Sequence, residues 1–132
     1  MNVLSREKEQ DTEVEVTWED QSKINAFSRL NRAVESLELD LAKVREDQDA
    51  LEDLASELEL VIDEDEPVPY KQGDAFVLVK LPKAQKMVQK ELERRKDEAD
   101  GIVKDIEKMK GEMGELKVYL YAKFKGAINL DK

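Results

Sequence analysis

The side chains that could do chemistry in this chain are almost all carboxylates. Its 132 residues include 32 acidic and 22 basic side chains, and the sequence contains no His and no Cys. Without imidazoles or thiolates, Cys/His zinc sites, disulfides and the most common acid–base and nucleophilic catalysts are excluded. The formal net charge of -10 also argues against a general nucleic-acid binder, because phosphate backbones are held by surplus Lys and Arg.

The acidic run from Asp63 to Glu66 could suggest a cation site. It lacks the Gly and the distal Glu of an EF-hand loop, so a solvated loop after a helix is the better interpretation. Paired carboxylates for hydrolysis can be chosen almost anywhere among 32 acidic residues, and nothing predicts a pocket that would raise a carboxyl pKa. We therefore expect no enzyme activity, no metal site and no cofactor.

Apolar side chains near the two ends of the chain are better candidates for a binding site. They are Trp18, Ile24 and Phe27 near the start, and Tyr121, Phe124 and Ile128 near the end. Exposed apolar side chains on an otherwise charged surface mark interaction sites, so these residues could bind apolar surface of another protein. The alternative is that the two groups cover each other, which we favour for Phe27, Leu116 and Leu120. Both interpretations stay open for Trp18, Tyr121, Phe124 and Ile128.

A long helix is predicted over residues 17–62 to position the first group. No Gly or Pro occurs from Trp18 to Glu66, so nothing there obstructs a helix. Two interleaved heptad series carry ten apolar side chains in eleven positions, which is typical of a coiled-coil seam. The positions are Phe27, Val34, Leu41, Gln48, Ala55 and Ile62, with Leu30, Leu37, Val44, Leu51 and Leu58. Thr17 can cap the first turn, and Asp20 can reach back as its capping-box partner.

A second helix is predicted over residues 83–124. Steps of four and three through this segment meet nine apolar side chains in ten positions, so the heptad pattern continues. The positions are Val88, Leu92, Arg95, Ala99, Ile102, Ile106, Met109, Met113, Leu116 and Leu120. Gly101, Gly111 and Gly114 each cost about 1 kcal/mol relative to Ala inside a helix, which predicts a softer second helix.

Two predicted helices of similar length joined by a short connection suggest an antiparallel hairpin, and charge favours pairing of the helices within one chain. Residues 1–66 hold 21 acidic and 7 basic side chains, whereas residues 67–132 hold 11 acidic and 15 basic ones. Opposite net charges favour pairing between the helices over self-pairing of either one. The apolar residues near the two ends of the chain would then meet at the free tip of the helical hairpin.

The segment between the helices, residues 67–81, predicts a β-hairpin. Its sequence PVPYKQGDAFVLVKL gives a strand at residues 68–71, a turn at Gln72, Gly73 and Asp74, and an apolar strand after the turn. An isolated two-stranded hairpin is marginal in water. We therefore expect the strands to pair with other chains, which makes the protein an obligate oligomer.

The expected organisation is one domain, residues 17–124, between an acidic N-terminal tail, residues 1–16, and a C-terminal tail, residues 125–132. The N-terminal tail has no apolar stretch typical of a signal peptide. No run of the sequence approaches the ~18 apolar residues of a membrane span. We expect a soluble intracellular protein that does not contact membranes.

Three stretches of the sequence resemble the β-type subunits of prefoldin, and most closely the eukaryotic subunit 4 type. They are VTWEDQSKINAF (Val16 to Phe27), VPYKQGDAFV (Val68 to Val77) and LKVYLYAKFKGAINL (Leu116 to Leu130). Their order and spacing match over nearly the whole chain. Two local differences are a Lys directly after Phe124, where the family usually has Gly, and the absence of a Ser-type cap in LPKAQ before the second helix.

The resemblance implies a mainly α fold: a long antiparallel two-helix coiled coil joined by a central β-hairpin that completes a β-barrel in an oligomer. That oligomer is a heterohexamer, so the partners would be two α-type and three further β-type subunits. The barrel residues would be Val68, Tyr70, Phe76, Val77, Leu78 and Val79. The residues that contact client proteins would be Trp18, Ile24, Phe27, Tyr121, Phe124 and Ile128.

The function implied by the resemblance is that of an ATP-independent co-chaperone. The coiled-coil tips would bind non-native actin and tubulin and deliver them to the cytosolic chaperonin, which places the protein in the cytoplasm and leaves a nuclear role open. The alternative is a structural coiled-coil tether subunit of another multiprotein complex, without client binding. That alternative explains the heptads but not the central hairpin or the aromatic residues near the chain ends.

Overall fold

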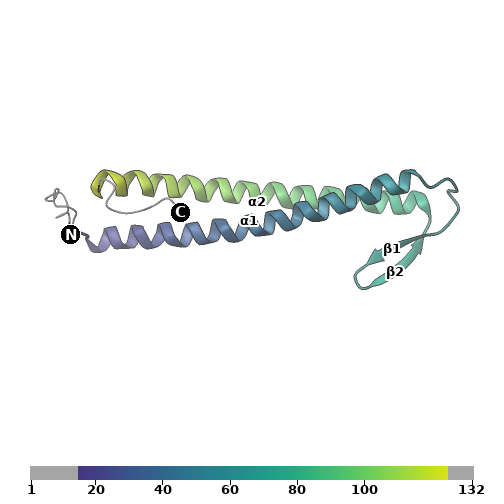
Figure 1. The fold of residues 1–132 in the computed structure, drawn as a ribbon, viewed down its shortest axis with the longest axis horizontal. Helices are drawn as coiled ribbons and strands as arrows, with labels where there is room; N and C mark the ends of the chain where they lie inside the picture. The colour runs from purple at the N-terminus through teal and green to yellow at the C-terminus, as the bar shows by residue number, and fades with distance from the viewer. Residues whose placement is uncertain (1–14, 125–132) are drawn as a thin grey trace. The chain divides into compact units, whose positions relative to one another are not determined.

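Two long helices and one β-hairpin make up the structure, a computed structural model that describes residues 15–124. Helix α1 (Trp18–Glu59) is followed by strands β1 (Val68–Gln72) and β2 (Ala75–Val79) and by helix α2 (Leu81–Phe124) (Figure 1). The predicted mainly α class, with a hairpin between the helices, is confirmed. Neither helix in the described range has an apolar stretch long enough to cross a bilayer.

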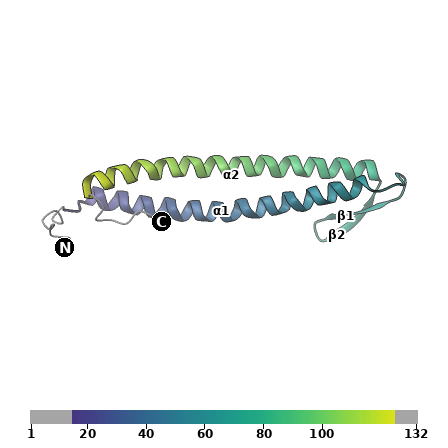
Figure 2. The same ribbon diagram turned by 45° about the horizontal axis from the view of Figure 1, so that its top comes forward.

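The chain divides into two compact units, and both helices contribute to each. The terminal unit comprises Met1–Glu38 and Lys104–Lys132, and the central unit comprises Leu39–Val103. Within the terminal unit, the start of α1 lies beside the end of α2, as Figures 1 and 2 both show. Within the central unit, the end of α1 lies beside the start of α2, next to the hairpin. The pairing of the helices is therefore antiparallel in both units, as predicted.

The start of α1 has the capping box that the sequence predicts. The Asp20 backbone N–H donates to Thr17 Oγ1 at 3.1 Å. In return, the Thr17 N–H donates to Asp20 Oδ2 at 3.0 Å. Two amide groups that a helix start would leave unpaired are thus satisfied, and α1 begins at Trp18.

The end of α1 differs from the prediction. The helix ends at Glu59 rather than at residue 62. The Leu60 N–H bonds to the Glu57 carbonyl at 3.0 Å, and the Val61 N–H bonds to the Leu58 carbonyl at 3.3 Å. Bonds that span three residues tighten the last turn and end the helix. Ile62 was therefore wrongly placed in the seam and is exposed, whereas Leu58 is buried as predicted.

Helix α2 begins two residues earlier than the predicted residue 83. Its first turn closes through the Ala84 N–H, which bonds to the Lys80 carbonyl at 2.9 Å. Pro82 lies inside this turn, where a missing N–H has no carbonyl partner to lose. Leu81 can therefore start the helix, and its buried side chain joins the core.

The hairpin has a two-residue turn and pairs Val68 with Val79 and Tyr70 with Val77. Gly73 has a φ of 64°, the positive value that two-residue hairpin turns require. Val79 packs with four buried residues of the helices, Leu58, Leu81, Ala84 and Val88. Val68 and Tyr70 lie partly buried against the same cluster. The hairpin is thus anchored on its own helices by one face.

Two glycines of α2 weaken that helix without a packing reason. A Cβ at Gly111 or Gly114 would meet no atom within 4 Å, and both positions are exposed. Replacing both with Ala should therefore raise the Tm, with a gain of about 1 kcal/mol per site. Thermal unfolding followed by circular dichroism measures this. Gly73→Ala is the control and should lower the Tm, because its positive φ strains an L-residue. A lower Tm for the double α2 variant would contradict the prediction.

Candidate functional site

An apolar cluster joins the two chain ends inside the terminal unit. Phe27, Leu120 and Phe124 are buried together. Four partly buried residues pack against them: Ile24, Met113, Leu116 and Tyr121. We call these seven residues the tip cluster. The predicted meeting of the two apolar groups is confirmed for the described residues. The burial of Phe27 and Leu120 fits the interpretation that the two groups cover each other.

A buried ion pair lies next to the tip cluster. Asp20 has 0 % of its surface exposed, and its carboxylate accepts a hydrogen bond from the Lys123 ammonium. The Tyr119 hydroxyl donates to Asp20 Oδ1 at 3.2 Å, and the Thr17 N–H donates to Oδ2. One carboxylate therefore caps the start of α1 and binds the last two turns of α2. We call the contact between Asp20 and Lys123 the seam-end ion pair.

The electrostatics of this contact favour its charged form. The hydrogen bond from Lys123 holds the pKa of Asp20 far below its ordinary value of 3.8, against the opposing effect of burial. The same bond raises the pKa of Lys123. Because the pKa of Asp20 is lower in the folded chain than in an unfolded one, its carboxylate stabilises the fold fully at neutral pH. This contribution is lost only as the pH falls below the ordinary Asp value toward the folded one.

The seam-end ion pair occupies the next position of both heptad patterns. Asp20 stands seven residues before Phe27, and Lys123 stands three residues after Leu120. The predicted series begin at Phe27 and end at Leu120, so both stop one step short of the pair. Extending each series by one step would have found an acid and a base facing each other at the end of the seam.

The candidate client-contact residues do not share one environment. Trp18 is 88 % exposed, whereas Ile24 and Tyr121 are half-buried. Phe27 and Phe124 are buried, the latter with 6 % of its surface exposed. For Phe124, where both interpretations were open, packing with Phe27 and Leu120 favours the one in which the two apolar groups cover each other. Ile128 falls outside the described residues.

Three further exposed apolar side chains of the terminal unit were not among the predicted client-contact residues. They are Val16, Val118 and Tyr119. Tyr119 is held on both sides, since its hydroxyl bonds to Asp20 and the Lys23 ammonium lies 4.8 Å from its ring centroid. The surface presented near Trp18 is therefore supported by hydrogen bonds and a cation–π contact.

The six predicted barrel residues lie on two faces of the hairpin. Val68, Tyr70, Val77 and Val79 share the face toward the helices, by the strand register and alternation. Phe76 and Leu78 lie on the opposite face, where they are 70 % and 69 % exposed. An exposed pair of large apolar residues on a two-stranded sheet is surface that a partner can cover.

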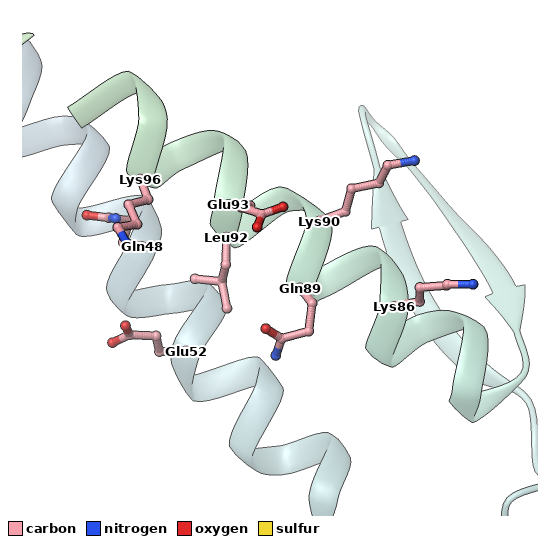
Figure 3. A pocket seen from close by; sticks show the side chains of 8 residues that line it. All are labelled: Gln48, Glu52, Lys86, Gln89, Lys90, Leu92, Glu93 and Lys96. Atoms are coloured by element: carbon pink, nitrogen blue, oxygen red, sulfur yellow. The ribbon is translucent and has the colours of Figure 1, made fainter. Parts of the chain in front are cut away.

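A hollow on the described part of the helix pair is lined almost entirely by polar side chains. Figure 3 shows a hollow on the helix pair lined by eight side chains: Gln48, Glu52, Lys86, Gln89, Lys90, Leu92, Glu93 and Lys96. Only Leu92 is apolar, so the hollow lacks the apolar walls of a small-molecule site. Within residues 15–124, no group of three or more acidic side chains is placed to hold a metal ion.

Most of the chain matches one known protein family. The model of the family described as "Prefoldin subunit" matches residues 21–127, a range that includes both helices from Gln21 onward and the hairpin. The chain belongs to the prefoldin family. Prefoldin subunits are non-enzymatic components of a chaperone complex, and this chain is a subunit of that kind.

Curated prefoldin relatives agree with this assignment and with the resemblance seen in the sequence. The chain is 39 % identical over 118 residues to "Prefoldin subunit 4" of Saccharomyces cerevisiae, covering 89 % of this chain and 91 % of that one. It is 34 % identical over 119 residues to "Probable prefoldin subunit 4" of Drosophila melanogaster, covering 90 % and 86 %. It is 32 % identical over 119 residues to "Prefoldin subunit 4" of Homo sapiens, covering 90 % and 89 %.

The seam-end ion pair should show the energetics of a buried charge pair. Lys123→Met leaves the carboxylate of Asp20 buried without its counter-ion and should lower the Tm markedly. Combining it with Asp20→Asn removes both charges and should recover most of the loss. Thermal unfolding at pH 7 measures both, with Lys108→Met as the control at an exposed lysine of the same helix. A double variant as unstable as the sum of the two single changes would contradict the pairing.

The exposed face of the hairpin should matter for assembly and not for the fold of the chain. Phe76→Asp changes a residue that contacts solvent here, so helicity by circular dichroism should stay unchanged. In a barrel with other subunits, the same carboxylate would be buried without a partner, at a cost of several kcal/mol, and incorporation should be lost. Leu39→Asp is the control, because Leu39 is also exposed but lies on α1. Normal incorporation of the Phe76 variant would disprove the assignment.

Proposed function

We propose that this prefoldin subunit binds non-native polypeptides of the actin and tubulin class at the tip cluster and its surroundings, and delivers them to the cytosolic chaperonin without ATP. The observation that carries the proposal is Trp18. This large apolar side chain is 88 % exposed at the first residue of α1. The tip cluster packs the two helices together without it. The packing of the helices gains little from it, so a binding role explains it better.

The surroundings of Trp18 support binding without rearrangement. Thr17 and Asp20 fix the backbone on either side of it through the capping box, and Lys123 joins that box to α2. A side chain presented on fixed backbone loses little further freedom on binding. Burial of its apolar area would contribute roughly 25 cal/mol per Å². Several such weak contacts from several subunits add through effective concentration, which suits a chaperone that must also release its client.

Assembly is the second part of the proposal. The partners would be two α-type and three further β-type prefoldin subunits, joined through the hairpins in a heterohexamer. Exposed Phe76 and Leu78 support this, since a lone two-stranded sheet gains stability when another strand or sheet covers it. The complex would act in the cytoplasm, with a nuclear role left open.

A structural tether without client binding is the competing function. It would use the same seam, but it gives no role to the central hairpin or to an exposed Trp at the start of α1. Suppression of the aggregation of unfolded actin by the reconstituted complex separates the two functions.

Trp18→Ser should weaken client capture while leaving assembly intact. Because other subunits contribute their own contacts, we expect a partial effect: about two- to fivefold more complex for half-maximal suppression of aggregation. The loss should depend little on salt, unlike that of an ionic interface. Leu39→Ser is the matched control, since Leu39 is 74 % exposed on the same helix. Unchanged suppression by the Trp18 variant at limiting complex concentration would contradict the proposal.

A further inference from the structure

A concentrated positive charge stands out in a chain that is acidic overall. Residues 71–96 hold eight basic and three acidic side chains, although the whole chain has a net charge of -10. The preceding residues 39–66 hold twelve acidic and two basic side chains. Both segments lie within the central unit. Within this unit, the segment at residues 39–66 is therefore acidic and the segment at residues 71–96 is basic.

Four of these cations form a line on α2. Lys83, Lys86, Lys90 and Arg94 recur at intervals of three and four residues, which places them on one side of the helix. All four are exposed. In Figure 3, Lys86 and Lys90 extend away from α1, whereas Leu92 points toward it. We call these four residues the basic stripe.

The stripe has few intramolecular partners. Arg94 pairs with Glu91 at 3.0 Å. Within residues 15–124, none of the three lysines of the stripe forms an ion pair or a hydrogen bond through its side chain. By contrast, Arg95 on the next row contacts Glu91, Glu98 and Asp47. The stripe thus differs from the paired charges beside it and leaves three ammonium groups open to a partner.

The stripe is continuous with the hairpin. A hollow between the hairpin and the helices is lined by Tyr70 and Lys71 on β1 and by Met87, Lys90 and Arg94 on α2. Lys71 pairs with Phe76 across the hairpin, so the two lie on the face that leaves Phe76 exposed. A chain that covers Phe76 would therefore also meet Lys71, which lines the same hollow as Lys90 and Arg94.

From these observations we propose that the basic stripe binds an acidic helical segment of a neighbouring prefoldin subunit. The inference rests on the proposed assembly through the hairpins. Residues 39–59 of this chain show that a helix of the fold can carry the required dense negative charge. Single exposed ion pairs contribute little to affinity. A row of like charges beside an apolar contact acts instead on the association rate and on the choice and orientation of the partner.

Two other occupants fit the structure less well. A nucleic acid fits less well because the net charge of the chain, -10, opposes the binding of a polyanion. A second copy of this chain could offer its own acidic α1 segment, but it would bring a further net charge of -10 into the contact. Both occupants are outcomes that the experiment below distinguishes.

The test is a charge-reversal triple variant, Lys83→Glu, Lys86→Glu and Lys90→Glu, in the full chain. The matched control is Lys43→Glu, Lys104→Glu and Lys108→Glu, which makes the same change in net charge at exposed lysines away from the stripe. The association rate with the other prefoldin subunits is measured at about 50 mM and about 500 mM salt. We expect the stripe variant to associate about tenfold more slowly than the control at low salt, with the difference shrinking at high salt.

A milder triple variant with Gln at the same three positions should show a smaller decrease in the same direction, which separates charge from any folding defect. Equal rates for stripe variant and control would overturn the proposal and leave the hairpin assembly standing. A wild-type chain that joins no other subunit would contradict both the proposal and the function on which it rests. A stripe variant that loses only self-association, or only binding to an oligonucleotide, would assign the stripe to a different partner and also overturn the proposal.

Discussion

The mutual burial of one face of α1 and one face of α2 is the constraint on which the rest of the structure depends. Each helix alone would expose a continuous apolar stripe. Helices in folded proteins gain most of their stability from packing such a stripe against a partner. In the terminal unit this burial holds Phe27 against Leu120 and Phe124. In the central unit it provides Leu58 and Val88, on which Val79 anchors the hairpin. The binding surfaces are the apolar residues that the seam leaves uncovered.

The seam closes on a charge pair, whereas the neighbouring seam positions Phe27 and Leu120 are apolar. Replacing a buried ion pair with packed apolar side chains is often neutral or stabilising. A polar pair, however, has one correct partner, and a polar seam position is an established way to fix helix register. Asp20 also belongs to the capping box. The same carboxylate therefore sets where α1 begins, how it aligns with α2 and, as a consequence, how Trp18 is presented.

Local signals predicted most of the fold, and contacts between distant residues accounted for the differences. The capping box at Thr17, the heptads and the turn at Gly73 depend on near neighbours in sequence, and all were found. The end of α1 depended on the tightened turn after Glu57, which leaves no sequence signal in an uninterrupted apolar and acidic run. The burial of Phe124 and the partnership of Asp20 with Lys123 depend on residues about a hundred positions apart. Which hairpin residues face the helices followed only once the strand register was known.

The most direct measurement is the titration of the Asp20 carboxyl group by NMR, with carbon-13-labelled Asp in the assembled protein and Asp20→Asn to assign the signal. If the seam ends in a buried pair with Lys123, this carboxyl stays ionised at pH values well below the ordinary Asp pKa of 3.8. In the Lys123→Met variant its pKa should rise, because the largest cause of the low value is removed. An Asp20 signal that titrates around the ordinary Asp pKa of 3.8 in the wild-type protein would contradict the arrangement.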